Sequence, residues 1–436
     1  MKKIFILIFL SLFTFSKFSS LNGVEIDVTE GKIEPLPIAI TKFNYENINI
    51  EDYSSKIFTI ISNNLGNTGL FKILSNQSFL QTENEVFFQP LFSDWRLIDA
   101  NFLVGGKIEL ENNILKVNLK LWDVYQEKLV INKNISGVSV ADWRILSHII
   151  SNLIYQKITG EKGYFDTKLV YVAEEGTDEK KIKKLAIMDY DGENHEILSD
   201  GKELVLTPRF SPNGKNIVFL KYKNNKASVY IMNIKSRDTK ILGDFTGMSF
   251  APRFSMDGKK IVLSITESGN TDIFSINLGT LERRRLTSNI GIDTAPSFSP
   301  DGKNIVFESD RGGGQQLYVI SSEGGDAKRI SFGEGKYATP VWSPRGDLIA
   351  FTKINKGKFH IGVMRVDGSN ERLLTTSFLD EGPAWSPNGR VIMFFRETPG
   401  KAGAPSIYSI DISGRNMKKI KTASFASDPN WSPLLN

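Results

Sequence analysis

The chain has 436 residues, of which 40% are hydrophobic and 24% charged; this suits two or three folded domains and excludes a largely disordered protein. The formal net charge is +5, but three lysines and no acid fall in the first 23 residues, so the rest carries +2 and offers no dense basic tract for nucleic acid. The absence of cysteine excludes disulfides, thiol nucleophiles, cysteine metal ligands and lipid attachment to an N-terminal cysteine.

The first 23 residues have the pattern of a Sec signal peptide. Lys2 and Lys3 precede an apolar run over residues 4–15, and a polar stretch follows over 16–23. The apolar run is too short to span a bilayer comfortably, so a retained membrane anchor is the weaker alternative. An exported, well-cored chain without disulfides indicates the periplasm of a Gram-negative bacterium.

Residues 24–160 carry both strand and helix patterns and predict an α/β domain. Apolar residues at helical spacing predict one helix over 51–65 and another from Asp142, as its N-cap, to Thr159 before Gly160. The last three predicted strands form an antiparallel meander whose first turn is at residues 111–113. The strands are expected at 37–43, 70–74, 100–110, 114–124 and 128–135.

A repeated motif organises residues 161–436. Its pattern is Pro-x-[Phe/Trp]-Ser-Pro-x-Gly, with Met256 replacing the second proline once and a truncated last copy. The first proline is expected to begin a strand, the aromatic residue to pack between units, and the end of the motif to form a tight turn. Further β-rich runs follow, such as 304–308 and 316–320, so each unit predicts the four strands of a propeller blade. The first prolines stand at positions 208, 252, 296, 340, 383 and 429.

The two ends of the repeat region complement each other. Strand patterns at 168–172, 184–188 and 195–198 precede the first motif, whereas only one strand, over 428–433, follows the last. The fragments together make one blade, which predicts a six-bladed β-propeller closed by its own last strand. An open solenoid is the alternative.

The sequence offers no catalytic, cofactor or metal centre. Its three histidines, His148, His195 and His360, are scattered, and no Gly-x-Ser-x-Gly elbow occurs. A propeller hydrolase or lyase acting on cell-wall components is the alternative function, and it predicts acids or histidines on the inner strands. The residues directly after the six prolines include no acid, which favours binding over catalysis.

The segments that precede the six prolines are expected to be loops that meet at one mouth of the central channel. They mix apolar residues with acids, which indicates a protein-binding surface. Asp293, Asp380 and Asp428 keep a small-ligand or ion-binding propeller open as a further possibility. The segments are 205–207, 246–251, 291–295, 335–339, 378–382 and 424–428.

Over nearly its whole length the chain resembles the TolB family of periplasmic propeller proteins. The propeller motif is shared with other propellers, and the N-terminal part makes the resemblance more specific. The segments that carry it are Leu-Pro-Ile-Ala-Ile at 36–40, Gly-Leu-Phe-Lys-Ile at 69–73, Leu-Lys-Leu-Trp-Asp-Val at 119–124, and the helix at 147–155 that runs into Thr-Gly-Glu-Lys-Gly-Tyr-Phe at 159–165.

The resemblance implies an adaptor, expected to be a monomer, that binds two proteins. Pal, the peptidoglycan-associated lipoprotein, would bind at the channel mouth, and TolA would bind the mature N-terminus as an added strand. Such an adaptor supports outer-membrane integrity and constriction at cell division. The implied Pal contacts and their neighbours are Met248, Ser249, Ala251, Asp293, Thr294, Tyr337 and Asp380; the implied TolA contacts are Val24, Glu25, Ile26, Asp27 and Val28.

Overall fold

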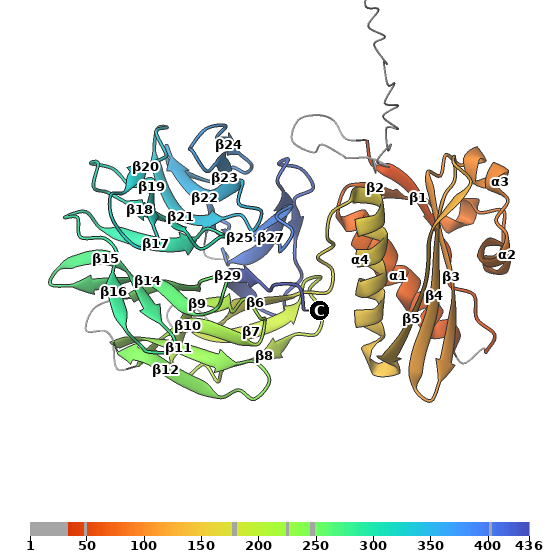
Figure 1. Cartoon of the computed structure of the whole chain (residues 1–436), viewed down its shortest axis with the longest axis horizontal. Helices are drawn as coiled ribbons and strands as arrows, with labels where there is room; N and C mark the ends of the chain where they lie inside the picture. The colour runs from red at the N-terminus through yellow and green to blue at the C-terminus, as the bar shows by residue number, and fades with distance from the viewer. Residues whose placement is uncertain are drawn as a thin grey trace, which may run out of the picture.

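The computed structural model describes residues 34–47, 50–176, 181–223, 226–244, 249–400 and 403–435. An α/β part precedes a six-bladed β-propeller, as the sequence predicts (Figure 1). The expected signal peptide, the segment 24–28 and Met248 lie outside the described residues. Within those residues, no helix combines the length and the hydropathy needed to cross a bilayer.

The α/β part is a five-stranded sheet with helices on both faces. The strands are β1 (Leu36–Ile40), β2 (Phe71–Ile73), β3 (Phe102–Glu111), β4 (Ile114–Asp123) and β5 (Lys128–Ser139), in the order β2-β1-β3-β4-β5. The long helices α1 (Glu51–Asn67) and α4 (Trp143–Thr159) lie between this sheet and the propeller, and the short helices α2 (Glu83–Phe88) and α3 (Phe92–Leu97) lie on the far side (Figure 1). The sequence analysis missed α2 and α3.

The ends of these elements follow from local chemistry. Asn112 and Asn113 both adopt positive φ, 51° and 62°, which matches the twist that a two-residue hairpin between β3 and β4 requires. Gly160 ends α4 in the left-handed conformation with φ 76°. Asp142 occupies the N-cap position of α4 as predicted, but its side chain makes no capping hydrogen bond; a short 3-10 turn over Val140–Asp142 leads into the helix instead.

In the described chain the propeller comprises six four-stranded sheets. The last of them, the split blade, has the order β29-β6-β7-β8, so the C-terminal strand completes the sheet that the N-terminal strands begin. The propeller strands are β6 (Lys168–Glu175), β7 (Ile182–Asp189), β8 (Glu196–Ile197), β9 (Leu204–Phe210), β10 (Asn216–Lys223), β11 (Lys226–Asn233), β12 (Thr239–Asp244), β13 (Ser249–Phe254), β14 (Lys260–Glu267), β15 (Asn270–Asn277), β16 (Arg283–Arg285), β17 (Asp293–Phe298), β18 (Asn304–Ser309), β19 (Gln316–Ser321), β20 (Lys328–Arg329), β21 (Lys336–Trp342), β22 (Leu348–Asn355), β23 (Lys358–Arg365), β24 (Arg372–Leu373), β25 (Leu379–Trp385), β26 (Val391–Glu397), β27 (Ser406–Asp411), β28 (Lys418–Lys419) and β29 (Phe425–Trp431).

The motif aromatics pack between neighbouring blades, as expected. Phe298 of β17 belongs to a buried cluster with Val262 and Ile273 of the preceding blade, and the Trp385 indole donates a hydrogen bond to the Val341 carbonyl at 3.0 Å. A similar hydrogen bond supports the split blade, where the Trp431 indole donates to Thr167 Oγ1 at 2.7 Å.

The role predicted for the first proline of each motif was wrong. Each proline lies inside the inner strand of its blade, at a β-bulge where the register with the next strand shifts. A proline fits at a bulge because its missing N–H costs no ladder hydrogen bond there. The segments expected as loops therefore include the leading halves of the inner strands. The residues before the prolines all have positive φ of 45–68° and are Thr207, Ala251, Ala295, Thr339, Gly382 and Asp428.

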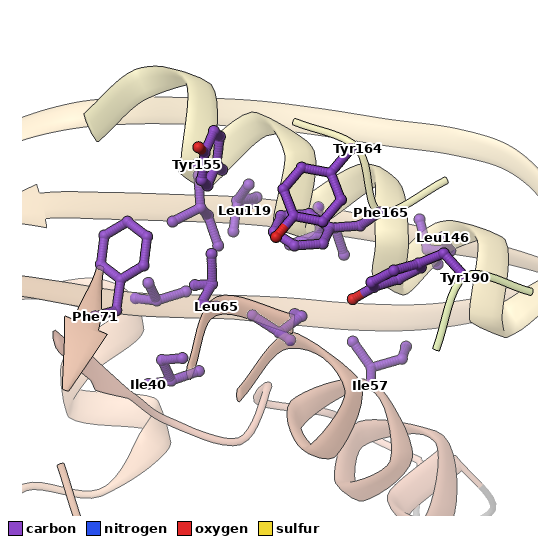
Figure 2. Packing of buried hydrophobic residues seen from close by; sticks show 14 of the residues in the cluster. Ile40, Ile57, Leu65, Phe71, Leu119, Leu146, Tyr155, Tyr164, Phe165 and Tyr190 are labelled. Carbon is purple, nitrogen blue, oxygen red and sulfur yellow. The ribbon is translucent and has the colours of Figure 1, made fainter. Parts of the chain in front are cut away.

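One buried cluster joins the α/β part to the split blade. Side chains of α1, β4 and α4 meet Tyr164 and Phe165 of the linker and Tyr190 of the split blade (Figure 2). Tyr190 stacks on Trp431 with ring centroids 6.3 Å apart, and its hydroxyl donates to Asn64 Oδ1 of α1 at 2.5 Å. The junction after Gly160 is therefore packed into a continuous core.

Candidate protein-binding mouth

The channel has two chemically different ends. All six inner strands begin at one end, which we call the leading mouth. At the other end, which we call the turn mouth, five of them lead into the motif turn that ends in glycine, and the sixth leads into the truncated motif at Ser432 and Pro433. The residues predicted to bind a partner belong to the leading mouth, since they lie in the first half of an inner strand or just before it.

Two of the predicted residues, Asp293 and Asp380, are fully buried in ion pairs. Asp380 accepts two hydrogen bonds from Arg396, Nε to Oδ1 at 2.6 Å and Nη2 to Oδ2 at 2.7 Å. Asp293 Oδ2 accepts from Arg311 Nη2 at 2.6 Å, while its buried Oδ1 has no partner among the described residues. Each pair joins an inner strand to the second strand of the same blade or its end, so these carboxylates hold the mouth in shape.

Tyr337 is also buried and belongs to a polar network. Its hydroxyl donates to Glu371 Oε2 at 2.6 Å and accepts from Lys353 Nζ at 2.8 Å, and Lys353 pairs with Glu371 at 2.6 Å. Burial, followed by the hydrogen bond to Glu371, raises the pKa of the Tyr337 hydroxyl. The tyrosine therefore fixes β21 against its own blade and presents no hydroxyl to solvent.

The other predicted residues are nearer the surface. Thr294 is half-buried and its Oγ1 donates to Glu308 Oε1 at 2.5 Å. Ala251 is half-buried at the bulge of β13. The backbone of Ser249 begins β13, and its side chain is outside the described atoms.

Behind this mouth, Glu308 and Asp428 lie close enough to Glu381 for their charges to act on its carboxyl group. Glu308 accepts the Thr339 N–H of the next blade at 2.7 Å, and Asp428 accepts the Thr207 N–H at 3.3 Å, so both tie neighbouring blades together. Burial, and then the charges of Asp428, Glu308 and Glu397, raise the pKa of Glu381 to about 7. The positions directly after the six prolines carry no acid, as the sequence analysis states, and Glu381 and Asp428 lie before the prolines in β25 and β29.

Exposed apolar side chains surround the leading mouth, and the sequence analysis identified only some of them. Ile290 is 97% exposed and Phe332 73% exposed, and they lie three and four residues before β17 and β21, respectively. Ile292 and Phe378 directly precede an inner strand, Phe425 begins one, and all three are about half exposed. Ile292, Phe378 and Phe425 fall within the segments that the sequence analysis expects at this mouth, whereas Ile290 and Phe332 do not. Large apolar side chains exposed around one mouth are a common feature of protein-binding surfaces.

A groove adjoins this apolar rim between the split blade and its neighbour. It has a volume of about 760 Å³ and is lined by the end of β6, by Ser406 and by residues 419–425. Phe425 lies in its wall, and Glu174 and Lys421 supply charge. The groove extends the surface that a protein partner could contact.

Comparison with known proteins decides the family. Residues 24–130 match the family described as "TolB amino-terminal domain", and residues 155–435 match "TolB beta propeller domain". The chain belongs to the TolB family. It is 53% identical to the "Tol-Pal system protein TolB" of Pelagibacter ubique, with 95% of each chain covered, and 54% identical to that of Paramagnetospirillum magneticum, with 94% and 93% covered. The crystal structure of TolB from Acinetobacter baumannii matches with a TM-score of 0.82 at 26% identity over 92% of this chain and 97% of that one.

Proposed function

We propose that the chain is a non-enzymatic periplasmic adaptor of the Tol–Pal system that binds Pal at the leading mouth and TolA through residues 24–28. Its relatives over nearly full length are named Tol-Pal system proteins. The observation that carries the proposal is the apolar rim, because Ile290 and Phe332 expose large hydrophobic side chains three and five residues before Asp293 and Tyr337, which the family resemblance places at or next to the Pal contacts. Through these two partners the adaptor supports outer-membrane integrity and constriction at division.

The buried polar residues have a supporting role in this proposal. Asp293, Asp380 and Tyr337 hold the leading halves of three inner strands by hydrogen bonds of 2.6 Å. A surface held in this way loses little conformational entropy when a partner binds, and preorganisation of that kind improves affinity. Met248, Ser249, Ala251 and Thr294 then complete the contact surface beside the apolar rim.

The alternative function, a hydrolase or lyase, has one candidate catalytic acid near the leading mouth, but a free second acid is missing among the carboxylates described there. Glu381, with a pKa of about 7, is suited to general acid catalysis. Glu308 and Asp428, however, already accept backbone N–H groups of neighbouring blades. Because these two carboxylates hold neighbouring blades together, Glu381 has no second acid with which to form the pair that glycoside hydrolysis needs.

The test is capture of purified soluble Pal by the full chain and by surface variants. Ile290→Ser and Phe332→Ser should each weaken Pal binding roughly tenfold or more, because hydrophobic anchors dominate such interfaces. Leu97→Ser is the matched control: Leu97 is equally exposed, at 76%, but lies on α3 at the far side of the α/β part. Unchanged Pal binding in both rim variants would overturn the Pal assignment.

TolA binding is tested separately by removing residues 24–28. The deletion should abolish capture by soluble TolA and leave Pal capture intact, since the two sites are on different parts of the chain. Capture of TolA at wild-type strength by the deletion variant would contradict the second assignment.

A further inference from the structure

The turn mouth contains a cavity that the adaptor function does not use. It has a volume of about 450 Å³ and is lined by motif residues from all six blades, together with Lys162 of the linker. The motif aromatics and prolines make its wall largely apolar. At the position after each first proline the six blades contribute Arg209, Arg253, Ser297, Val341, Ala384 and Asn430, so the charges at this level are two arginines on adjacent inner strands.

The two guanidinium groups lack acidic partners. Arg209 is 7% exposed; its Nη1 donates to the carbonyl of Pro208 at 2.7 Å, and its buried Nε has no partner among the described residues. Arg253 is half-buried, and its guanidinium makes neither a hydrogen bond nor an ion pair with the described residues. Asp428 is the acid whose charge acts on Arg209, but its carboxylate bonds the Thr207 N–H and forms no ion pair with the arginine.

The cavity is therefore lined by two positive charges that no acid among the described residues neutralises through an ion pair. Burial lowers the pKa of Arg209, and burial followed by the charge of Arg209 lowers the pKa of Arg253 well below its usual range. Guanidinium groups nevertheless stay protonated in proteins, so the repulsion is not relieved by proton loss. Buried charges of one sign are normally paired, and an unpaired donor such as Arg209 Nε is an exception that calls for a ligand.

We propose that the cavity at the turn mouth binds a small divalent oxyanion, of the phosphate class, between Arg209 and Arg253. The planar donor fork of each arginine matches an oxyanion in two-point geometry, and one dianion neutralises both charges. The apolar wall lowers the local dielectric and so strengthens the attraction, and Lys162 of the linker also lines the cavity. The cavity lies at the other end of the channel from the apolar rim, so the oxyanion site is distinct from the proposed Pal surface.

The test is calorimetric titration of the full chain with inorganic phosphate, at an ionic strength held constant with sodium chloride. The wild type should bind one phosphate saturably, and Arg209→Gln/Arg253→Gln should weaken binding roughly a hundredfold, about tenfold for each charged donor lost. Arg283→Gln is the matched control, because Arg283 is exposed on β16 and outside the cavity. Binding to the wild type and the double variant with equal affinity, or no saturable binding to the wild type at millimolar phosphate, would overturn the proposal.

A second measurement covers the case in which a variant folds poorly. Without phosphate, Arg253→Gln removes one of two repelling charges and should melt at or above the wild-type temperature. Added phosphate should raise the melting temperature of the wild type and not that of the variant, by the linkage between binding and stability. An equal rise in both proteins would mean a general salt effect and would contradict a site between the arginines.

Discussion

The leading mouth and the turn mouth are two ends of the same six strands, but charged side chains are paired at the first and unpaired at the second. At the leading mouth, Asp293 and Asp380 are each paired with an arginine of the same blade, and apolar side chains are exposed around them. At the turn mouth, Arg209 and Arg253 have no acidic partner among the described residues, and apolar side chains form the wall of a cavity. A platform held by buried ion pairs suits a protein partner, whereas unpaired charge in a cavity suits a small ion.

The largest effect is expected from a truncation that opens the propeller ring, because both mouths depend on that ring. Ending the chain before Phe425 removes β29, the inner strand of the split blade, and with it Trp431 from the cluster that joins the two parts of the protein. Cooperative unfolding by circular dichroism should be lost. Ending the chain after Pro433 is the matched control and should change the melting temperature little. A truncation before Phe425 that still unfolds cooperatively at the wild-type temperature would show that β29 does not close the ring.

A smaller effect is expected from breaking one buried pair at the leading mouth. Arg396→Met leaves the fully buried Asp380 carboxylate without its partner and should cost about 3–5 kcal/mol in urea unfolding. The double variant Asp380→Asn/Arg396→Met should recover most of this loss. By contrast, Arg284→Met, which breaks an exposed pair with Glu323, should cost less than about 1 kcal/mol. Equal costs for the two single variants would refute the supporting role of the buried pair.

The acids behind the leading mouth should make stability depend on pH. The pKa of Glu381 is about 7 in the folded chain against an ordinary value of 4.5 for a glutamate side chain, so the folded state holds this proton more tightly than the unfolded state. Its stabilising contribution is full below pH 4.5 and is lost as the pH rises through 7.

Comparison with Glu381→Gln isolates this contribution. As the pH rises from 4.5 to above 7, the free energy of unfolding of the wild type should fall by up to about 3 kcal/mol relative to that of the variant, measured by urea unfolding. Glu282→Gln, at an exposed position, should give a difference that is flat with pH. A flat difference for Glu381→Gln as well would mean that this carboxyl is not desolvated in the mouth.

The sequence predicted the elements that depend on short-range patterns. The repeated motif identified six blades and the split blade, and Asn112 and Gly160 marked a hairpin and a helix end where backbone conformation selects those residues. The bulge at each first proline was missed because a proline pattern alone does not show whether a strand starts before it. The helix α2 was missed although its capping box, Thr82 with Glu85, is visible in the sequence.

The candidate site was less predictable, because its chemistry depends on pairs distant in the sequence. Asp293 and Asp380 could be placed at a mouth, but their partners Arg311 and Arg396 follow 18 and 16 residues later, and only the strand register brings them together. The exposure of Phe332 likewise depends on how its loop lies on the blade. In contrast, the arginines after Pro208 and Pro252 were visible from the motif, and only their lack of partners required the structure.

The most direct test is hydrogen–deuterium exchange of the full chain with and without soluble Pal. Pal should slow amide exchange at the leading mouth, in segments that include residues 289–294, 332–338 and 378–382. The turns at 211–214, 299–302 and 343–346 should exchange equally fast in both samples. Protection of the turns, with no change at the leading mouth, would contradict the central claim that the exposed rim is the docking surface.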